Sequence, residues 1–479
     1  MPPWTRGNLH HYAIIIVAIL VSLWMSSLQG EFPSDDAFIH LRFARNFADT
    51  GELAFNPGEK SYSTTSPLWN VMVGLAARAT GTAPAGLLHL SRILAAVLLA
   101  LAALALYWLA RIIHDRWIVL VPVLFVLDPY ATATVHGGME QPLFVLLGAL
   151  GFILVQVGSR GSKLAGAGAA MALVLQYAAR PEALAFVAAA GLFLSIRRQW
   201  SVLAVFSLVA IAMFIPLALT LQSNLGSIVP LSMLMKTHDA SGWMPFTATD
   251  VLGRLIHLFG QVYAVPLALT AALLVFGAAD RARTLASRSL LVLLLTGMLG
   301  GAYFAYLKEN AVASRYFVNF VPFLIVALGG AFAELQARRW SAAAAGVLVL
   351  FMIAGNLAAA PRRTARGLQL EPERIEIGVW LRDNTPATAS VWIYDIGYVG
   401  FYSERRIYDF NLVRTPDQGL ATSLSKRQGL LDIAEAIRAS GIEYLVWGTR
   451  EIPDIPMEPA YQVKTPVAGR HRTIYRILY

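Results

Sequence analysis

The feature that most constrains the fold is a series of apolar runs, each close to the length of about 20 residues that a helix needs to cross a bilayer. Only 14% of the 479 residues are charged, against about a quarter in soluble proteins. The sequence therefore predicts a polytopic α-helical membrane protein. The runs expected to span, about 11 in all, are 11–29, 86–112, 117–134, 140–158, 162–179, 182–197, 200–222, 257–278, 288–307, 316–337 and 340–360.

A change in composition marks a second domain. Of the 67 Asp, Glu, Lys and Arg residues, 30 lie between Pro361 and the C-terminus. We therefore expect a transmembrane domain over 1–360 and a soluble domain over 361–479. Within the latter, the residue pattern predicts a small α/β domain. Its expected elements are helices over 371–384 and 430–441, strands over 390–395 and 443–448, and a terminal hairpin.

Basic residues in the loops predict the orientation in the membrane. They cluster at Arg6, 111–116, 159–163, 197–198, 280–288 and 338–339. With a cytoplasmic N-terminus, every cluster lies on the cytoplasmic side, as the positive-inside rule requires, and the C-terminal domain lies outside. The pattern holds only if the short apolar stretch 67–79, which contains Asn70 and Arg78, is interfacial rather than spanning. The net charge of +9 is thus explained by topology, and no nucleic-acid partner is expected.

Residues 30–85 then form a large extracytoplasmic loop that carries two adjacent carboxylates, Asp35 and Asp36, directly after the first span. Two neighbouring anions at a lipid boundary are costly to maintain, which indicates a function. A structural alternative exists, because Ser34 and the two aspartates precede an amphipathic helix, and acidic residues favour helix N-termini. Both interpretations are compatible if one aspartate caps the helix while the other acts.

The other predicted outer loops also carry ionisable residues at or near membrane depth, where such residues usually face a cavity. Basic groups at an interface suit a lipid phosphate. Carboxylates beside such cations suit group transfer from a lipid-phosphate carrier, in which an Asp takes the proton of an acceptor hydroxyl and cations stabilise the leaving phosphate. These loop residues are Glu140, Glu182, Arg180, Lys236, Lys308 and Arg315, with His40, His136 and His238 nearby.

Several of these residues have a structural alternative. Arg180 and Glu182 could pair with each other across the "RPE" turn, where Pro181 begins the next helix. The aliphatic part of the Lys236 side chain could lie along apolar surface while its ammonium group reaches the membrane interface. Arg315 could anchor the following helix, and His136 could form hydrogen bonds within its loop.

Six motifs along the chain resemble a known family. The stretch "DDAFIHLRFARNFADTGELAFNPGEKSYSTTSPLW" (35–69) is similar to the first-loop signature of bacterial GT-C-fold glycosyltransferases, near the mycobacterial terminal arabinofuranosyltransferases. The remaining motifs follow in the family's order. They are "GGMEQPLF" (137–144), "ARPEA" (179–183), "LGSIVPLSMLMK" (225–236), "SRYFVNFVPFL" (314–324) and "WLRDNTPATASVWIYDIGYVGFYSERRIYD" (380–409).

The resemblance implies a GT-C fold with an N-in/C-out orientation in the bacterial inner membrane, and an active site on the periplasmic side. It implies inverting, single-displacement transfer of a sugar from a polyprenyl-phosphate carrier to an extracytoplasmic glycan, lipid or protein acceptor. The resemblance to the mycobacterial arabinofuranosyltransferases suggests arabinofuranose as the sugar. Many relatives have Pro-Asn-Thr where this chain has Pro230, Leu231 and Ser232, and this departure leaves the donor sugar open.

The resemblance also implies roles for individual residues. The catalytic base is Asp35 or Asp36. Donor or phosphate contacts are assigned to Arg180, Lys236, Arg315 and His238, and substrate or network contacts to Glu140, Glu182, His136, Arg42, Trp69 and Tyr316. No cofactor is implied, and no ligand spacing demands a metal, although an aspartate pair could hold a divalent cation.

A flippase or transporter for lipid-linked sugars, which forms no new bond, is the alternative class. Transporters usually show repeated halves with charges near the midplane. Here no internal repeat is visible, and the ionisable residues gather on one predicted side. These features favour an enzyme.

Overall fold

The computed structural model describes residues 9–30, 33–113, 118–230, 319–320, 322–323, 326, 341–393, 395–409, 437–438, 440–448, 455–465 and 472–479. The chain divides into two compact units, each described by itself. Unit 1 comprises Met1–Gln29, Arg92–Leu217 and Pro245–Pro361. Unit 2 comprises Gly30–Ser91, Ala218–Met244 and Arg362–Tyr479.

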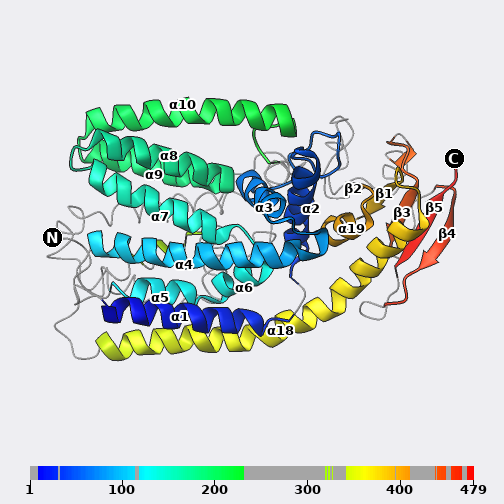
Figure 1. Cartoon of the computed structure of the whole chain (residues 1–479), viewed down its shortest axis with the longest axis horizontal. Coiled ribbons are helices and arrows are strands. Elements are labelled where there is room, and N and C mark those ends of the chain that lie inside the picture. The colour runs from blue at the N-terminus through cyan, green and yellow to red at the C-terminus, as the bar shows by residue number, and fades with distance from the viewer. Residues whose placement is uncertain are drawn as a thin grey trace, which may run out of the picture. The chain divides into compact units, whose positions relative to one another are not determined.

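Unit 1 is built from apolar helices, and its long helices run roughly parallel (Figure 1). The described helices that lie in it wholly or in part are α1 (Leu9–Ser27), α4 (Leu87–Ile113), α5 (Leu120–Val126), α6 (Pro129–Gly137), α7 (Gln141–Gly158), α8 (Lys163–Ala179), η3 (Pro181–Ala183), α9 (Leu184–Ile196), α10 (Trp200–Leu225) and α18 (Ser341–Asn384). Large apolar side chains such as Leu208 and Ile211 are exposed on α10. Such surfaces suit lipid, because in a bilayer the helix exterior has no need to be polar.

Five of the described helices are long and apolar enough to cross a membrane, and six if one bent pair counts as a single span. The chain is therefore a multi-pass membrane protein. The predicted spans 162–179 and 182–197 correspond to shorter apolar helices. The predicted spans 257–278 and 288–307, and most of 316–337, lie outside the described residues, so the total of eleven and the orientation stay predictions.

The structure corrects the predicted span 117–134, which is not one straight helix. Helices α5 and α6 meet there at an angle of 53°. Asp128 caps α6 by accepting hydrogen bonds from the backbone N–H groups of Tyr130 at 2.7 Å and Ala131 at 3.1 Å. Pro129 occupies the first helical position, where its missing N–H costs nothing. The Asp-Pro pair therefore starts a new helix inside an apolar run.

A second correction concerns α18, which is continuous over Ser341–Asn384. The sequence predicts a span over 340–360 and a separate helix over 371–384, whereas the structure joins them. A helix of 44 residues is about 66 Å long, roughly twice the thickness of the bilayer core. Charged residues begin at Arg362, so the part of α18 from Arg362 onward lies outside the membrane-spanning segment.

The described part of unit 2 contains a five-stranded sheet in the order β2-β1-β3-β5-β4. Strands β2, β1 and β3 are parallel, while β5 is antiparallel to both β3 and β4. The apolar core on the sheet includes Trp392, Tyr408 and Leu445. The strands are β1 (Ser390–Ile393), β2 (Arg406–Asp409), β3 (Tyr444–Trp447), β4 (Met457–Gln462) and β5 (Thr473–Ile477).

Strands β1 and β3 confirm the two predicted strands, and the antiparallel pair β4 and β5 confirms the predicted terminal hairpin. Most of the predicted helix 430–441 lies outside the described residues. Helix α19 (Ile396–Ser403) connects β1 to β2. The boundary between a transmembrane and a separate C-terminal α/β domain stays a prediction.

Among the described residues, the first loop supplies three further helices of unit 2, namely α2 (Asp35–Thr50), α3 (Pro67–Thr80) and the short η2 (Pro84–Gly86). Helix α2 packs against both α3 and α19. The α2–α3 contact is close at Gly74, where a Cβ would lie 2.7 Å from the carbonyl oxygen of Ala44. Segment 67–79 is helical, as predicted, and is not among the helices long enough to span.

Candidate active site

The paired aspartates occupy the first turn of α2. Ser34 precedes them in an extended conformation at the N-cap position, but its side chain makes no capping hydrogen bond. Acidic side chains in a first turn interact favourably with the positive end of the helix dipole. The two aspartates thus lie within the helix, whereas the sequence places them before it, and Ser34 does not act as its cap.

The carboxylate of Asp35 caps a different helix, α19. Its Oδ2 accepts a hydrogen bond from the backbone N–H of Gly397 at 3.0 Å, and its Oδ1 accepts one from the N–H of Tyr398 at 3.0 Å. These are the second and third residues of α19, whose N–H groups an N-cap side chain normally binds. The sequence leaves open which aspartate caps its own helix; in the structure Asp35 caps α19, where the N–H of Gly397 lies 362 residues further along the chain.

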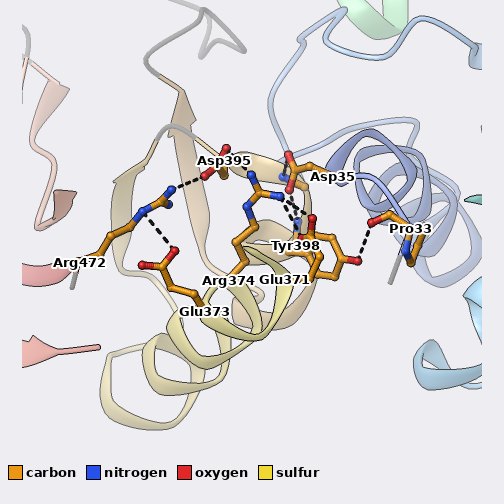
Figure 2. Close-up of polar contacts among 9 residues, drawn as sticks. Pro33, Asp35, Glu371, Glu373, Arg374, Asp395, Tyr398 and Arg472 are labelled. Carbon is orange, nitrogen blue, oxygen red and sulfur yellow. Dashed lines mark hydrogen bonds and ion pairs between the residues drawn. The ribbon is translucent and has the colours of Figure 1, made fainter. Parts of the chain in front are cut away.

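Asp395 holds the N-cap position of α19 yet makes no side-chain capping bond. Its carboxylate is paired on both oxygens instead. Oδ1 lies 2.9 Å from Nη2 of Arg374, and Oδ2 lies 2.7 Å from Nη2 of Arg472 (Figure 2). Asp35 therefore caps α19 in place of Asp395.

The backbone of α2 also approaches α19 closely. A Cβ on Gly397 would lie 2.0 Å from the backbone carbonyl oxygen of Asp35, so a side chain at this position cannot coexist with the contact. Next to it, the Tyr398 hydroxyl donates to the carbonyl oxygen of Pro33 at 2.9 Å (Figure 2). The Tyr398 ring packs on Phe38, with 3.9 Å between the ring centroids. Together these contacts fix the start of α2 on α19.

The surroundings of Asp35 bring its titration close to neutral pH. Burial raises the pKa of Asp35 to about 6, against the opposing effects of the Arg374 charge and the two backbone N–H groups, while Asp395 raises it further. Glu371 is affected similarly. Burial raises the pKa of Glu371 to about 7, with Arg374 opposing and Asp35 contributing. Carboxyl groups with pKa values in this range suit proton transfer at physiological pH.

The two aspartates are both partly exposed and lie in the first turn of α2, where Asp35 is bonded to the backbone of α19. Asp35 is anchored by two backbone hydrogen bonds, so its orientation is fixed by the fold. Both remain candidates for the catalytic base.

Arg42 joins the first loop to the C-terminal part of unit 2. Its Nε donates to the carbonyl oxygen of Phe55 at 3.1 Å, its Nη2 to that of Arg405 at 3.2 Å, and its Nη1 to that of Gly400. All three side-chain nitrogens thus bind backbone carbonyls. This geometry favours a structural role for Arg42 over the substrate contact that the resemblance implies. Trp69 is also fully buried, at 0% exposure.

The "FNPGE" turn of the first loop extends this joint to the edge of the sheet. The side-chain amide of Asn56 donates to the carbonyl oxygen of Ile407 at 3.0 Å and accepts from its N–H at 3.0 Å. The amide of Asn56 thereby pairs with the edge strand β2 as the backbone of a neighbouring strand would. Glu59, in the same turn, forms an ion pair with Arg406. The motif therefore acts by docking the first loop onto the sheet.

In unit 1, Arg180 lies between two carboxylates. Its Nε and Nη2 donate to Oε2 and Oε1 of Glu182 at 3.2 and 2.8 Å, and its Nη1 donates to Oε1 of Glu140. All three side chains are buried. The pairing of Arg180 with Glu182, one of the two alternatives from the sequence, is present. Phosphate binding by Arg180 stays a prediction.

Replacing Arg180 with Met is expected to destabilise the protein by about 3–5 kcal/mol, because two buried carboxylates lose their compensating charge. Thermal unfolding in detergent measures the effect. Arg160, which is exposed in unit 1, offers the matched control: its replacement by Met is expected to change stability by no more than about 0.5 kcal/mol. Equal melting temperatures for the two variants would contradict the assignment of Arg180 as a buried ionic centre.

The other predicted site residues are placed only in part. His136 is buried at 9% exposure, and its backbone carbonyl accepts a hydrogen bond from Nε of Arg92 at 2.6 Å. Lys236, His238, Arg315 and Tyr316 lie outside the described residues. Within the described ranges, no group of three or more His, Asp or Glu residues is placed to hold a metal ion.

Sequence reasoning missed the charged residues that surround Asp35, namely Glu371, Arg374, Asp395 and Arg472. One local signal was available. Asp395 ends a predicted strand and precedes "IGY", and an Asp in this position is typical of a helix N-cap. No local signal pairs Asp395 with two arginines, because those partners come from distant parts of the sequence.

The comparison with solved structures defines the class of fold. The oligosaccharyltransferase of Archaeoglobus fulgidus, solved with a tethered acceptor peptide containing the NVT sequon, superimposes with a TM-score of 0.63 at 14% identity, covering 93% of this chain and 70% of that chain. ArnT from Cupriavidus metallidurans bound to undecaprenyl phosphate gives a TM-score of 0.59 at 11% identity, covering 98% of both chains. The protein therefore has the GT-C glycosyltransferase fold.

The likeness extends to the family predicted from the motifs. The mycobacterial arabinofuranosyltransferase AftD gives a TM-score of 0.52 at 16% identity, covering 97% of this chain and 40% of that chain. This confirms the predicted resemblance at the level of fold. Residues 362–475 match a family described as a domain of unknown function (DUF8728). No curated protein matches the chain.

Proposed function

We propose that the protein is an inverting glycosyltransferase that moves a sugar from a polyprenyl-phosphate carrier to an extracytoplasmic glycan, lipid or protein acceptor. The observation that carries this proposal is the Asp35 carboxylate. It is held in a fixed orientation at the start of α2 by two backbone N–H groups of α19. The GT-C fold supports the donor class, because one solved protein of similar fold binds undecaprenyl phosphate.

In the proposed reaction, Asp35 takes the proton from an acceptor hydroxyl. A carboxylate offers about four acceptor sites, and the bonds to Gly397 and Tyr398 use two of them, so the group can still receive a proton. The acceptor oxygen attacks the anomeric carbon as the bond from that carbon to the phosphate oxygen breaks. The polyprenyl phosphate leaves with the bonding electrons, and a single displacement inverts the configuration. Asp36 is the second candidate for the same step.

The leaving phosphate carries negative charge that nearby cations would stabilise. In this proposal the donor is bound by the residues selected from the sequence, Arg180, Lys236, His238 and Arg315. Substrate contacts are assigned to Glu140, Glu182, His136 and Tyr316. The resemblance to bacterial GT-C enzymes supports a location in the bacterial inner membrane, and the positive-inside pattern of the loops supports a site on the periplasmic side. Arabinofuranose is the first sugar to test, since the fold resembles that of AftD.

Mass spectrometry of envelope glycans, lipids and surface proteins tests the function in cells. Cells that lack the protein are expected to lose one sugar from a single class of extracytoplasmic acceptor. The native chain should restore that sugar, while a chain carrying both Asp35→Asn and Asp36→Asn should not. An unchanged envelope in cells without the protein, or full restoration by the double variant, would refute the proposal.

The rate of transfer is expected to fall on the acid side of about pH 6. Burial raises the pKa of Asp35 to about 6, and a general base must be ionised to accept a proton. A raised pKa keeps more of the carboxyl protonated at a given pH, so activity is lost sooner on acidification. Below the pKa the rate should drop about tenfold per pH unit.

Initial rates measured between pH 4 and pH 8 check this profile. The Asp49→Asn variant is the control, because Asp49 lies on the same helix with a side-chain exposure of 61%. The rate of this variant should fall over the same pH range as that of the native protein; this fall on the acid side is the acid limb of the profile. If the acid limb of the native protein lay near pH 4, the usual range of an aspartate, the assignment of Asp35 as base would be contradicted.

A further inference from the structure

We infer that Arg374 and Arg472 are positioning residues for the Asp35 carboxylate, acting through Asp395 and the first turn of α19. The inference rests on the proposed function, in which Asp35 is the catalytic base. It gives a role to the segment 362–475, which matches a domain of unknown function. That segment would hold the first-loop aspartate in its reactive orientation.

Asp395 is fixed from two sides. Arg374 reaches it from the polar half of α18, and Arg472 reaches it from the residue before β5 (Figure 2). Arg374 is itself fixed, because its Nη1 donates to Oε1 and Oε2 of Glu371 at 2.8 and 3.0 Å. Nε of Arg472 lies 3.5 Å from Oε2 of Glu373. Arginines from α18 and from the residue before β5 thus both bind the residue that precedes α19.

The two arginines determine which carboxylate caps α19. An Asp at an N-cap position normally accepts hydrogen bonds from the second and third N–H groups of its helix. Here the arginines occupy both oxygens of Asp395, and those N–H groups, on Gly397 and Tyr398, bind Asp35. Without the arginines, Asp395 would compete for the same N–H groups. Its charge would also repel Asp35.

The charges around Asp35 act in opposite directions. Arg374 lowers the pKa of Asp35, whereas Asp395 raises it. The groups that face Asp35 are Arg374 and Glu371 on α18, Asp395 before α19, and Tyr398 on α19. Removing the positive charge and removing the negative charge should therefore shift its titration in opposite directions.

The test uses Arg374→Gln and Asp395→Asn in the full-length protein, with the pH dependence of kcat as the readout. Arg374→Gln is expected to lower kcat roughly 10–100-fold with little change in KM, since a misplaced catalytic group loses rate. Its acid limb should move to higher pH by about one unit. The limb of Asp395→Asn should move to lower pH, because the repelling charge is gone.

Three further variants separate positioning from general stability. Arg374→Lys keeps the charge and should restore the position of the acid limb, but not the full kcat, because Lys lacks the planar fork. Arg472→Gln should lower kcat in the same way as Arg374→Gln. Arg382→Gln is the matched control, since Arg382 lies on the same helix in an exposed pair with Asp383, and it should behave as the native protein.

Limbs that stay at the native pH, or that move in the same direction in Arg374→Gln and Asp395→Asn, would overturn the inference. A readout without activity distinguishes its failure from failure of the proposed function. The infrared carboxyl stretch of Asp35 is identified as the band that Asp35→Asn lacks. Its change with pH reports the titration of Asp35 directly. If the native protein transfers no sugar but this titration shifts oppositely in the two variants, the positioning holds and the proposed function fails.

Discussion

Asp35→Asn is expected to lower the rate of sugar transfer by about 10²–10⁴-fold, the usual contribution of a general base. An amide cannot take the proton of the acceptor hydroxyl. Stability should fall less severely. The amide oxygen can still accept one N–H bond from α19, while the amide nitrogen would face the other N–H group, at a cost of about 1–3 kcal/mol. Initial rates and melting temperatures in detergent measure the two effects separately.

Two comparisons make this result informative. Asp36→Asn tests the second candidate for the base, and the larger loss of rate identifies the group that takes the proton. Asp49→Asn, an exposed position of α2, should leave both rate and stability unchanged. Near-native rates in both Asp35→Asn and Asp36→Asn would show that neither aspartate is catalytic.

Gly397→Ala is expected to separate α2 from α19 and to remove transfer activity together with stability. The added Cβ would lie 2.0 Å from the carbonyl oxygen of Asp35, a distance that no pair of unbonded atoms adopts. The backbone must therefore move, and Asp35 loses its two hydrogen bonds. We expect a destabilisation of at least about 1–3 kcal/mol and a loss of rate of about 100-fold from the displaced carboxylate.

Gly346→Ala provides the control for this change. Gly346 lies on α18, and a Cβ there would meet nothing within 4 Å. Because Ala favours a helix interior over Gly, the control should be neutral or slightly stabilising, by about 0.5–1 kcal/mol. If Gly397→Ala melts and reacts like the native protein, the close contact between α2 and α19 does not exist in solution.

The sequence predicts well what depends on local pattern. Apolar runs locate the long helices, and short apolar runs locate the strands at Ser390–Ile393 and Tyr444–Trp447. The break at Asp128 and Pro129 was also local, since Asp followed by Pro is a helix-start signal. It was overlooked because the surrounding run is apolar enough to suggest a single span.

The candidate site was less predictable, because its partners are distant in sequence. The paired aspartates are visible as charges beside an apolar run, and acidic residues at a helix start suggest a cap. Nothing local indicates that Asp35 caps α19 rather than α2. That choice depends on Arg374 and Arg472 occupying Asp395, which is a property of the folded unit. Arg42 illustrates the same limit, since a guanidinium that binds three backbone carbonyls has the same sequence signature as one that binds a substrate.

Transfer by the purified protein in detergent tests the central claim most directly. The protein is incubated with a panel of synthetic polyprenyl-phosphate sugars, including arabinofuranose, and with an envelope extract from cells that lack it. The account predicts a new glycosidic bond of inverted configuration, with one polyprenyl phosphate released per sugar transferred. A flippase needs two compartments and forms no bond. The opposite result, no bond formed in detergent while the same preparation moves lipid-linked sugar across the bilayer of a vesicle, would contradict the account.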